Sequence, residues 1–480
     1  MKRAITCTAL LLLAAPAALA TGLDATAVLK RADATMGASA LKTLRYSGSG
    51  SAWQFGQAYK PGPWPKLYVG SYTRLVDYDK AAWREDLVRS RAEPTGGGAV
   101  PLSGDQRLSI AVSGAHAWNQ VGPAPAATPR DVPNRVHDLW ITPHGVIKAA
   151  IRNNAKLEFR TVGGKEVAVV SFIEPGQYAA TAYINANYVV ERVESRMPNP
   201  VLGDTSVVTH YEGYQQYGPI LFPTRIRQSA GGEAVFDLAV IDVQPGAAVD
   251  IPVPEVVRGF AERIASEKAA DGVWYIAGAS HHSVAIEMQD HVVLVESPLY
   301  DGRAAPMLAE VKRLIPGKPI RYVVNSHFHF DHAGGLRTAA AEGATVVVHQ
   351  GSKAWYEKAL ANPNRISPDL LAKSGKKAKV MGAGDKLVLK DGTRTVEIHA
   401  IKDSVHAAPF LMVYLPKEKL LVEADAYTPL APNAAPPSPP NANNVNLVQN
   451  IERLQLAVER ILPLHGRIVP MAELYRTIGR

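Results

Sequence analysis

The most informative stretch of the sequence is Ser326-His327-Phe328-His329-Phe330-Asp331-His332-Ala333-Gly334-Gly335. The chain has 14 histidines in 480 residues, and three of them lie with an aspartate between positions 327 and 332. The run before this stretch, residues 320–325, is short, apolar and rich in β-branched residues, as buried strands are. Residues 333–336 begin a helix-like segment. The polar side chains are therefore predicted to lie just past the carboxyl end of a strand.

The spacing of these side chains predicts how they are shared between two faces. In an extended chain, residues two apart point the same way, so His327, His329 and Asp331 would share one face and His332 would lie on the other. One loop can then supply two adjacent metal sites. Imidazole nitrogens and carboxylate oxygens are ligands that suit zinc, and manganese, iron or cobalt are compatible with them. The stretch predicts a metal centre.

The stretch resembles the H-x-H-x-D-H signature of the metallo-β-lactamase-fold superfamily, whose members are mostly hydrolases with two metal ions. The family pattern continues with a histidine before an apolar strand, an acid after the next strand and a late His-Gly pair. This sequence has His406 before the run 410–415, Asp425 after the run 420–424, and His465 followed by Gly466. The resemblance covers about residues 270–480 and implies an α+β fold for them, an αββα sandwich.

The resemblance also implies the role of each ligand. The first metal would be held by His327, His329 and His406, the second by Asp331, His332 and His465, with Asp425 bridging them. Two Zn²⁺ ions are expected, with Mn²⁺ or iron as alternatives, and a hydroxide between them would be the nucleophile. Asp331 and Asp425 are the expected catalytic side chains.

The start of the chain predicts export. Residues 1–20 combine Lys2 and Arg3, an apolar run and the small-x-small sequence Ala18-Leu19-Ala20, as a cleavable signal peptide does. The only cysteine, Cys7, lies within this segment, so the mature chain would have neither disulfides nor cysteine ligands. No later segment is long and apolar enough for a membrane anchor. We expect a periplasmic or secreted protein.

Residues 21–255 predict a separate, mainly antiparallel β domain. Helices are predicted at residues 23–44, with a break at Gly37, and at 143–152. Short strands are predicted at residues 66–72, 107–112, 167–172, 178–184, 188–194 and 235–240, with glycine turns at 96–98, 163–164 and 231–232. The pattern weakly resembles the curved open sheets of exported lipoprotein-carrier proteins, which hold apolar molecules. A packed scaffold is the alternative, and the role of this domain stays open.

The proline-containing residues 242–254 predict a connector to a catalytic domain at 270–480. A strand meander over 273–276, 283–288 and 292–296 follows, and Glu296 stands where the superfamily commonly has Asp, in a structural position. The turn residues His281 and His282, with Tyr427, are candidates for substrate contact, although an exposed turn is the alternative for the two histidines. Residues 353–379 and 429–446 are predicted pocket walls, and 450–461 a helix.

The predicted function is an exported binuclear hydrolase, with zinc as the expected metal, acting on an ester, lactone, lactam or related small molecule. True β-lactamases of the superfamily usually have Cys or Ser where this chain has Asp425. Two alternatives remain, an iron-dependent oxygenase of sulfur compounds and a binding protein with a vestigial metal site. The formal charge falls from +8 to +6 without Lys2 and Arg3, and no basic field suggests nucleic acid. The substrate is expected to be a small molecule, with an apolar one as an option, and the oligomeric state is left open.

The predicted domain boundary also suggests that catalysis and substrate selection belong to different domains. Because residues 327–465 already complete both metal sites, a chain beginning near Val256 is expected to bind two metals and to hydrolyse small activated esters. It is expected to lose the preference for bulky apolar substrates. An unchanged ranking of substrates would instead make the first domain a scaffold.

Overall fold

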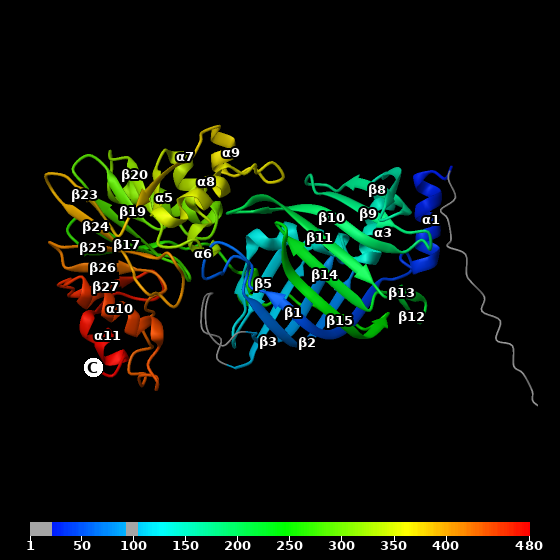
Figure 1. Cartoon of the computed structure of the whole chain (residues 1–480), viewed down its shortest axis with the longest axis horizontal. Helices are drawn as coiled ribbons and strands as arrows, with labels where there is room; N and C mark the ends of the chain where they lie inside the picture. Colours follow the sequence, from blue (N-terminus) through cyan, green and yellow to red (C-terminus); the bar gives the residue numbers. More distant parts are fainter. Residues whose placement is uncertain (1–21, 93–103) are drawn as a thin grey trace, which may run out of the picture.

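The computed structural model describes residues 22–92 and 104–480, which form two lobes (Figure 1). The expected signal peptide, residues 1–20, and the expected turn at 96–98 lie outside the described residues. Among the helices of the described part, none has the length and hydropathy needed to cross a bilayer.

The N-terminal lobe is built on one antiparallel sheet, in which 13 strands belong to the described residues. In sheet order they are β6 (Ala126–Ala127), β5 (His116–Gln120), β4 (Gln106–Ser113), β3 (Ala82–Arg91), β2 (Lys66–Asp77), β1 (Thr43–Trp53), β15 (Glu233–Pro245), β14 (Arg225–Ala230), β11 (Gly203–Glu212), β10 (Val190–Asn199), β9 (Ala179–Ile184), β8 (Lys165–Ile173) and β7 (Lys156–Val162). A small hairpin, β12 (Gln215–Tyr217) and β13 (Ile220–Phe222), lies apart from it. Every strand predicted for this half is present.

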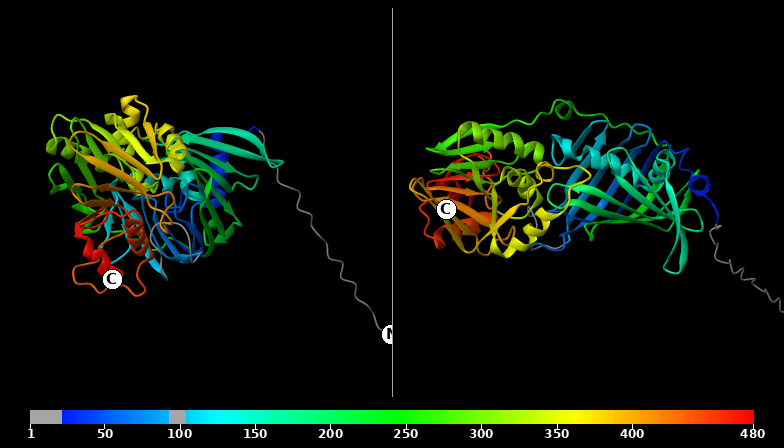
Figure 2. Two further views of the ribbon diagram at one scale, coloured as in Figure 1. Left: turned by 60° about the vertical axis from the view of Figure 1, so that its left-hand side comes forward. Right: turned by 90° about the horizontal axis from the view of Figure 1, so that it is seen from above.

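Three helices pack against this curved sheet and share its core (Figure 2). Helix α1 (Ala25–Met36) begins where Asp24 accepts a hydrogen bond from the Ala27 amide, and it ends at Gly37, whose φ of 71° suits glycine. The helix ends at Gly37 as predicted, but its predicted continuation to residue 44 is wrong, because residues 37–40 form turns and β1 begins at Thr43. Helix α3 (Pro143–Arg152) has the predicted bounds. Helix α2 (Val132–Trp140), preceded by η1 (Pro129–Asp131), was missed because Pro133 falls inside it, in its first turn, where proline is tolerated.

The C-terminal lobe contains two sheets that face each other. The first is β16 (Ala265–Ala270), β17 (Val273–Ala277), β18 (Ser283–Glu287), β19 (Val292–Val295), β20 (Ile320–Val324), β21 (Thr345–His349) and β22 (Lys379–Ala383). The second is β23 (Lys386–Lys390), β24 (Thr395–Ala400), β25 (Leu411–Leu415), β26 (Leu420–Glu423), β27 (Arg460–Pro463) and β28 (Val469–Pro470). Strands buried on both faces explain the continuous apolar runs of the sequence.

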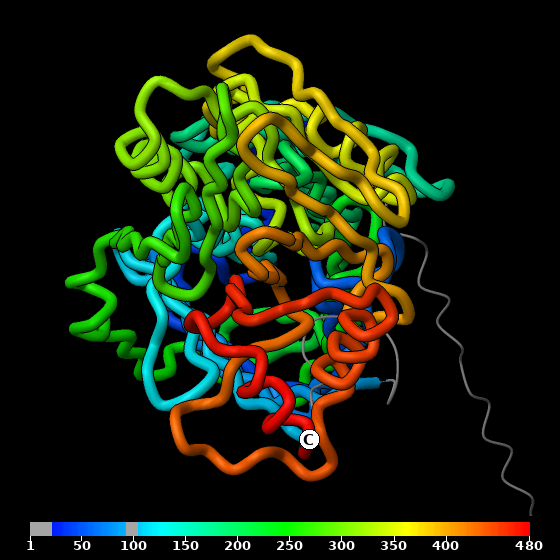
Figure 3. The backbone as a smooth tube through the Cα atoms, turned by 90° about the vertical axis from the view of Figure 1, so that its left-hand side faces the viewer, coloured from blue at the N-terminus to red at the C-terminus, as the bar shows by residue number. Residues whose placement is uncertain are grey.

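The alternation of strand residues divides this lobe into four layers. In β19, Val293 and Val295 face the second sheet, whereas Val292 and Leu294 face helices on the other side. Those helices are α5 (Asp301–Leu314), α7 (Leu336–Glu342), α8 (Lys353–Ala361, after η2, Gln350–Ser352) and α9 (Leu370–Ser374). The second sheet is covered by α10 (Ala442–Arg453) and α11 (Met471–Thr477). Figure 3 shows the green-to-yellow helices on one side of the lobe and the orange-to-red ones on the other. The order helix, sheet, sheet, helix is as expected.

Two predicted boundaries were wrong. The connector begins only at Gly246, because β15 continues to Pro245, and it includes the short helix α4 (Glu255–Arg258). The helix predicted at 450–461 is α10, which begins at Ala442 because the Asn441 side chain caps it by accepting from the Asn443 amide. The proline-rich loop before it is therefore shorter than expected.

The lobes are docked on each other at three places in the described chain. Residues 54–65, between β1 and β2, reach the other lobe, and Tyr59 makes two of the contacts there. The turn between β10 and β11 contacts residues 362–366, where the Arg365 amide donates to Asp204 over 2.8 Å. Arg130 donates to the Leu299 carbonyl over 3.3 Å.

Candidate metal centre

Seven predicted ligands meet at one edge of the two sheets of the C-terminal lobe. The loop after β20 carries His327 and His329, and the short helix α6 (Phe330–Ala333) that follows carries Asp331 and His332. The second sheet supplies the rest from the loops beside its strands: His406 before β25, Asp425 after β26 and His465 after β27. Loops at strand ends converge because parallel neighbours such as β26 and β27 end on the same side.

Three imidazoles form the first group. The Nε2 atom of His327 lies 2.8 Å from Nδ1 of His329, and Nε2 of His406 lies 3.2 Å and 3.1 Å from these two atoms. One carboxylate oxygen, Oδ2 of Asp425, lies 2.8 Å from His406 Nε2. Four ligand atoms thus surround one point.

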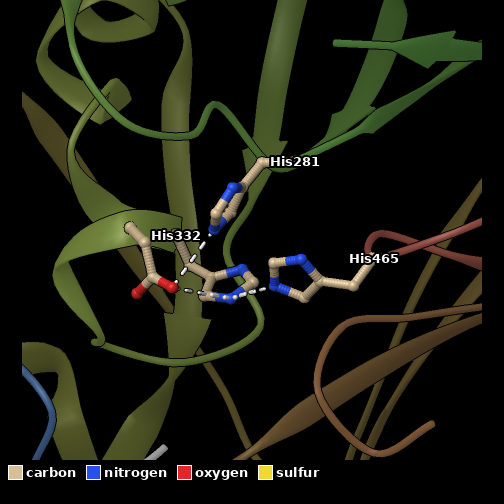
Figure 4. A group of neighbouring side chains, drawn as sticks. His281, His332 and His465 are labelled. Atoms are coloured by element: carbon tan, nitrogen blue, oxygen red, sulfur yellow. Dashed lines mark hydrogen bonds and ion pairs between the residues drawn. The ribbon is translucent and has the colours of Figure 1, made fainter. Parts of the chain in front are cut away.

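The second group lies on the other side of Asp425. Its other oxygen, Oδ1, lies 3.0 Å from Nε2 of His332 and 2.9 Å from Nε2 of His465. The two Nε2 atoms are 3.2 Å apart (Figure 4). Oδ2 of Asp331 is 3.8 Å from His332 Nε2. Asp425 therefore has one oxygen in each group, as a bridging ligand has.

The predicted division of the loop residues between two faces was wrong for one residue. Asp331 lies with His332 in the second group, and not with His327 and His329. The reason is that residues 330–333 form a helical turn and do not continue the extended chain, so the alternation of a strand stops at His329.

The hydrogen bonds of the ring nitrogens that face away from the groups show which nitrogens direct a lone pair inward. Nε2 of His329 faces the Ala58 carbonyl at 2.8 Å, and Nδ1 of His465 faces the Ser280 carbonyl at 2.9 Å. A carbonyl only accepts, so these nitrogens carry the hydrogen and the inner nitrogen of each ring is bare. Bare nitrogens about 3 Å apart repel one another unless a cation lies between them. The arrangement fits a pair of metal ions.

The charges around the site also fit cations. Burial lowers the pKa of His327 well below its ordinary value and that of His329 to about 4, so both are neutral ligands. Burial works against ionised Asp425, but His332 and His406 outweigh it and hold the pKa of this carboxyl well below its usual range. Burial likewise works against charged His332, and the carboxylates of Asp425 and Glu296 outweigh it and raise its pKa well above the usual value, so this place favours a positive charge, which a metal ion would supply beside a neutral ring.

Glu296 supports the site from behind. It is fully buried at the end of β19 and accepts from the Ser326 amide over 2.7 Å and from the Asn325 side chain over 3.1 Å. Its other oxygen lies 3.1 Å from Nδ1 of His332. The carboxylate thus fixes both the loop and the orientation of one ligand ring, which is the common arrangement around metal-binding histidines.

The N-terminal lobe contributes contacts that the sequence did not reveal. Gln57 donates to Oδ1 of Asp331 over 2.7 Å, and the Ala58 carbonyl accepts from His329. One residue earlier, the Gly56 carbonyl accepts from the Phe330 amide over 3.2 Å. The first lobe supplies none of the seven predicted ligands, yet it holds one residue of each metal group. No local pattern in residues 54–59 signals this role.

The three candidates for substrate contact have different surroundings. The His281 ring enters the second group, with Nε2 3.1 Å from Oδ2 of Asp331. His282 points away from it and accepts from the Gly278 amide over 3.1 Å. Tyr427 is fully buried in the core, with its hydroxyl 3.5 Å from Thr477. We therefore leave Tyr427 out of the proposed substrate contacts, since a substrate would have to displace core packing to reach it.

The second group is the more accessible one. The side chains of Asp331 and His465 are 28% and 21% exposed, whereas those of His327 and His406 are 0% and 3% exposed. A molecule that approaches the centre therefore meets the second group first.

Comparison with known proteins agrees with the geometry. Residues 276–426 match the family model described as the Metallo-beta-lactamase superfamily. Similar solved structures include a metallo-beta-lactamase from Pontibacter korlensis (18% identity, 45% of this chain and 98% of that one, TM-score 0.35). Another is the DIM-1 metallo-beta-lactamase (15% identity, 46% of this chain and 97% of that one, TM-score 0.34). The family match and the two His/Asp groups indicate a metal-dependent hydrolase in general terms.

Proposed function

We propose that the protein is an exported hydrolase with two metal ions, expected to be zinc, that acts on an ester, lactone, lactam or related small molecule. The observation that carries the proposal is Asp425, whose two oxygens face two separate groups of converging ligand atoms. Metal ions bound there would make water a nucleophile near neutral pH and polarise the acceptor oxygen of the substrate. The proposal of export rests on the character of residues 1–20.

The two carboxylates at the centre have distinct tasks. Burial opposes ionisation of Asp331, but His332 and His281 outweigh it and keep the pKa of this carboxyl well below its usual range. Asp331 is therefore ionised at neutral pH, and its Oδ2 atom can accept a proton but has none to donate. Asp425 is ionised for the same reason and holds the two groups together. The proton for a leaving group would then come from water, either directly or through Asp331 after this carboxylate has accepted it from the attacking water.

The exposure of the site guides which substrates to test first. The side chains of Asp331 and His465 are partly exposed, so a small molecule would reach the second group from this side, and the histidines of the first group are almost completely buried. Hydrolysis of a β-lactam is the less favoured member of the proposed class, because Asp425 occupies the position where Cys or Ser is usual in such enzymes. Esters and lactones are the first substrates to test.

The test is metal analysis combined with an esterase and lactonase panel on the purified chain without residues 1–20. We expect two metal ions per chain, complete loss of turnover on chelation, and recovery with Zn²⁺ or Mn²⁺. The variants His406→Ala and His465→Ala should each lose one metal and at least about 100-fold in turnover. Full turnover in a verified metal-free sample would refute the proposal, and a single bound iron would point to oxygenase chemistry.

A further inference from the structure

The turn between β17 and β18 brings one more imidazole to the metal centre (Figure 4). His281 extends from this turn toward His332 and His465 in Figure 4, and Asp331 belongs to the same group of ligand atoms. Its ring centroid lies 4.3 Å from that of His465 and 5.4 Å from that of His332, both edge-on. The ligand atoms of these four residues all lie within 4.8 Å of one another.

We propose that His281 is a metal ligand of the second group. This inference rests on the proposed function, since it requires the second group to hold a metal ion. It gives that group five protein ligand atoms, from His281, Asp331, His332, His465 and Asp425. The first group has four, from His327, His329, His406 and Asp425, so the two sites are chemically unequal.

The distances suit a common ion. Metal bonds to imidazole nitrogen and carboxylate oxygen are about 2.1 Å long, so ligand atoms at right angles lie about 3 Å apart and opposite ones about 4.2 Å apart. His281 Nε2 and Asp331 Oδ2 are 3.1 Å apart, and the Nε2 atoms of His332 and His465 are 3.2 Å apart. The separation of 3.8 Å between Asp331 and His332 lies between the two values.

The ring of His281 is oriented for this role by its own turn. Its outer nitrogen, Nδ1, lies 2.7 Å from the Ser280 hydroxyl, which can accept its hydrogen and leave Nε2 as a lone pair. The His281 carbonyl accepts from the guanidinium of Arg303 over 2.9 Å. Arg303 is almost completely buried, so this support is rigid.

The same turn also fixes a ligand of the predicted set. The Ser280 carbonyl accepts from Nδ1 of His465, and the His282 amide donates to the Leu464 carbonyl over 2.9 Å. Gly278 allows the close approach of Arg303, because a Cβ at this position would lie 1.9 Å from its guanidinium. A turn that holds one ligand and presents a second imidazole is built as part of the metal site.

The proposal has a consequence for metal preference. Zinc in proteins is usually bound by four atoms, whereas manganese and iron accept more. With five protein ligand atoms, the second site is expected to retain Mn²⁺ or Co²⁺ better, relative to Zn²⁺, than the first site does.

The test measures Co²⁺ binding to metal-free protein in a His406→Ala background, which weakens the first group so that one equivalent of Co²⁺ reports on the second. Adding His281→Ala should weaken Co²⁺ binding at least about 10-fold in competition with a chelator. It should also strengthen the visible absorption per Co²⁺, because Co²⁺ with fewer ligands absorbs more strongly. His281→Gln, which keeps most of the side-chain volume, should weaken binding in the same direction, and circular dichroism checks that each variant is folded.

The matched control is His399→Gln in the same background, because His399 is also a buried imidazole, and its ring lies 2.9 Å from Glu397 on β24, outside both groups. It should leave both affinity and absorption unchanged. Weaker binding with unchanged absorption in the His281 variants would show that His281 only orients Asp331 through a hydrogen bond, and would overturn the inference. Absence of any second metal in the wild-type chain would instead refute the proposed binuclear function.

Discussion

At the residue scale, the candidate metal centre depends on groups that accept a hydrogen bond from the outer nitrogen of a histidine ring and so orient the inner nitrogen toward the site. Glu296 is the clearest example, because one carboxylate serves the loop backbone and the outer nitrogen of His332. Its backbone has a φ of 66°, which is unusual for a residue other than glycine and is kept where the surroundings require it. The Glu that replaces the usual Asp of the resembled family therefore retains a defined task.

We expect Glu296→Gln to weaken metal binding at the second group by about 10-fold to 100-fold. An amide nitrogen placed at either carboxylate oxygen would face a hydrogen-bond donor, so one contact must be lost. Chelator competition on the purified variant measures the change. The control is Glu287→Gln on the nearby strand β18. This change removes the ion pair between Glu287 and Lys318 and should leave the metal affinity unchanged.

At the element scale, the segment 54–65 is a connection between two strands of one lobe that acts in the other. Its aromatic residues Phe55 and Trp64 pack edge-on against Phe330, with ring centroids 5.3 Å and 5.5 Å away. Gly56 lies directly against the same ring with a φ of 87°. The segment is therefore seated at the start of α6, next to two predicted ligands.

The variant Gly56→Ala tests whether the packing of residues 54–65 against Phe330 positions the ligands. The added Cβ would lie 2.4 Å from the Phe330 ring, and the φ value strains any residue but glycine, so the segment should shift away from His329 and Asp331. We expect metal affinity to fall at least about 10-fold, measured with a chelator. Gly62→Ala lies in the same segment with open space around it and should bind as the wild type does. Equal affinities for the two variants would show that the segment does not position ligands.

Helix packing in the N-terminal lobe gives a separate prediction about pH. His144 on α3 is fully buried, stacks on Phe222 and lies 3.2 Å from the Met36 carbonyl at the end of α1. Burial lowers its pKa to about 4, so the unfolded chain binds a proton here at a higher pH than the folded one. Its contribution to stability is complete above about pH 6.5 and is lost as the pH falls toward 4, by about 3 kcal/mol in all.

Unfolding by guanidinium at pH 7 and at pH 4.5 measures this effect. The wild type should lose more stability between these two conditions than the variant His144→Gln, which has no titrating group at this position. An equal loss in both proteins would show that His144 is already protonated in the folded state or solvated there.

At the scale of the whole molecule, both lobes contribute contacts to the candidate metal centre, although its predicted ligands all come from one lobe. The docking contacts include Asp204 with the backbone of residues 365 and 366, besides the segment 54–65. Such contacts hold the first lobe against α6 and α8. The two lobes are therefore joined by direct contacts as well as by the connector.

A chain beginning near Val256 is still expected to bind two metals, but the contacts between the lobes predict a loss of affinity. Without the first lobe, His329 loses the carbonyl of Ala58 and Asp331 loses the amide of Gln57. We expect the shortened chain to bind both metals at least about 10-fold more weakly than the full one. Calorimetric titration of the two purified proteins makes the comparison, and equal affinities would return the first lobe to the role of a substrate-selecting or scaffold domain.

The sequence alone was enough to predict a candidate metal centre and much of the local structure. The spacing of His327, His329, Asp331 and His332 predicted a metal centre because ligand types and strand ends are local signals. The three later ligands were found through the resemblance to a family and not through a local pattern. The sequence did not reveal that residues 330–333 form a helical turn, that Tyr427 is packed in the core, or that His281 joins the second group. Only the tertiary structure decided that Gln57 and Ala58 lie against the ligands. Contacts between residues more than 270 positions apart depend on how two folded lobes dock, and no short sequence pattern records that.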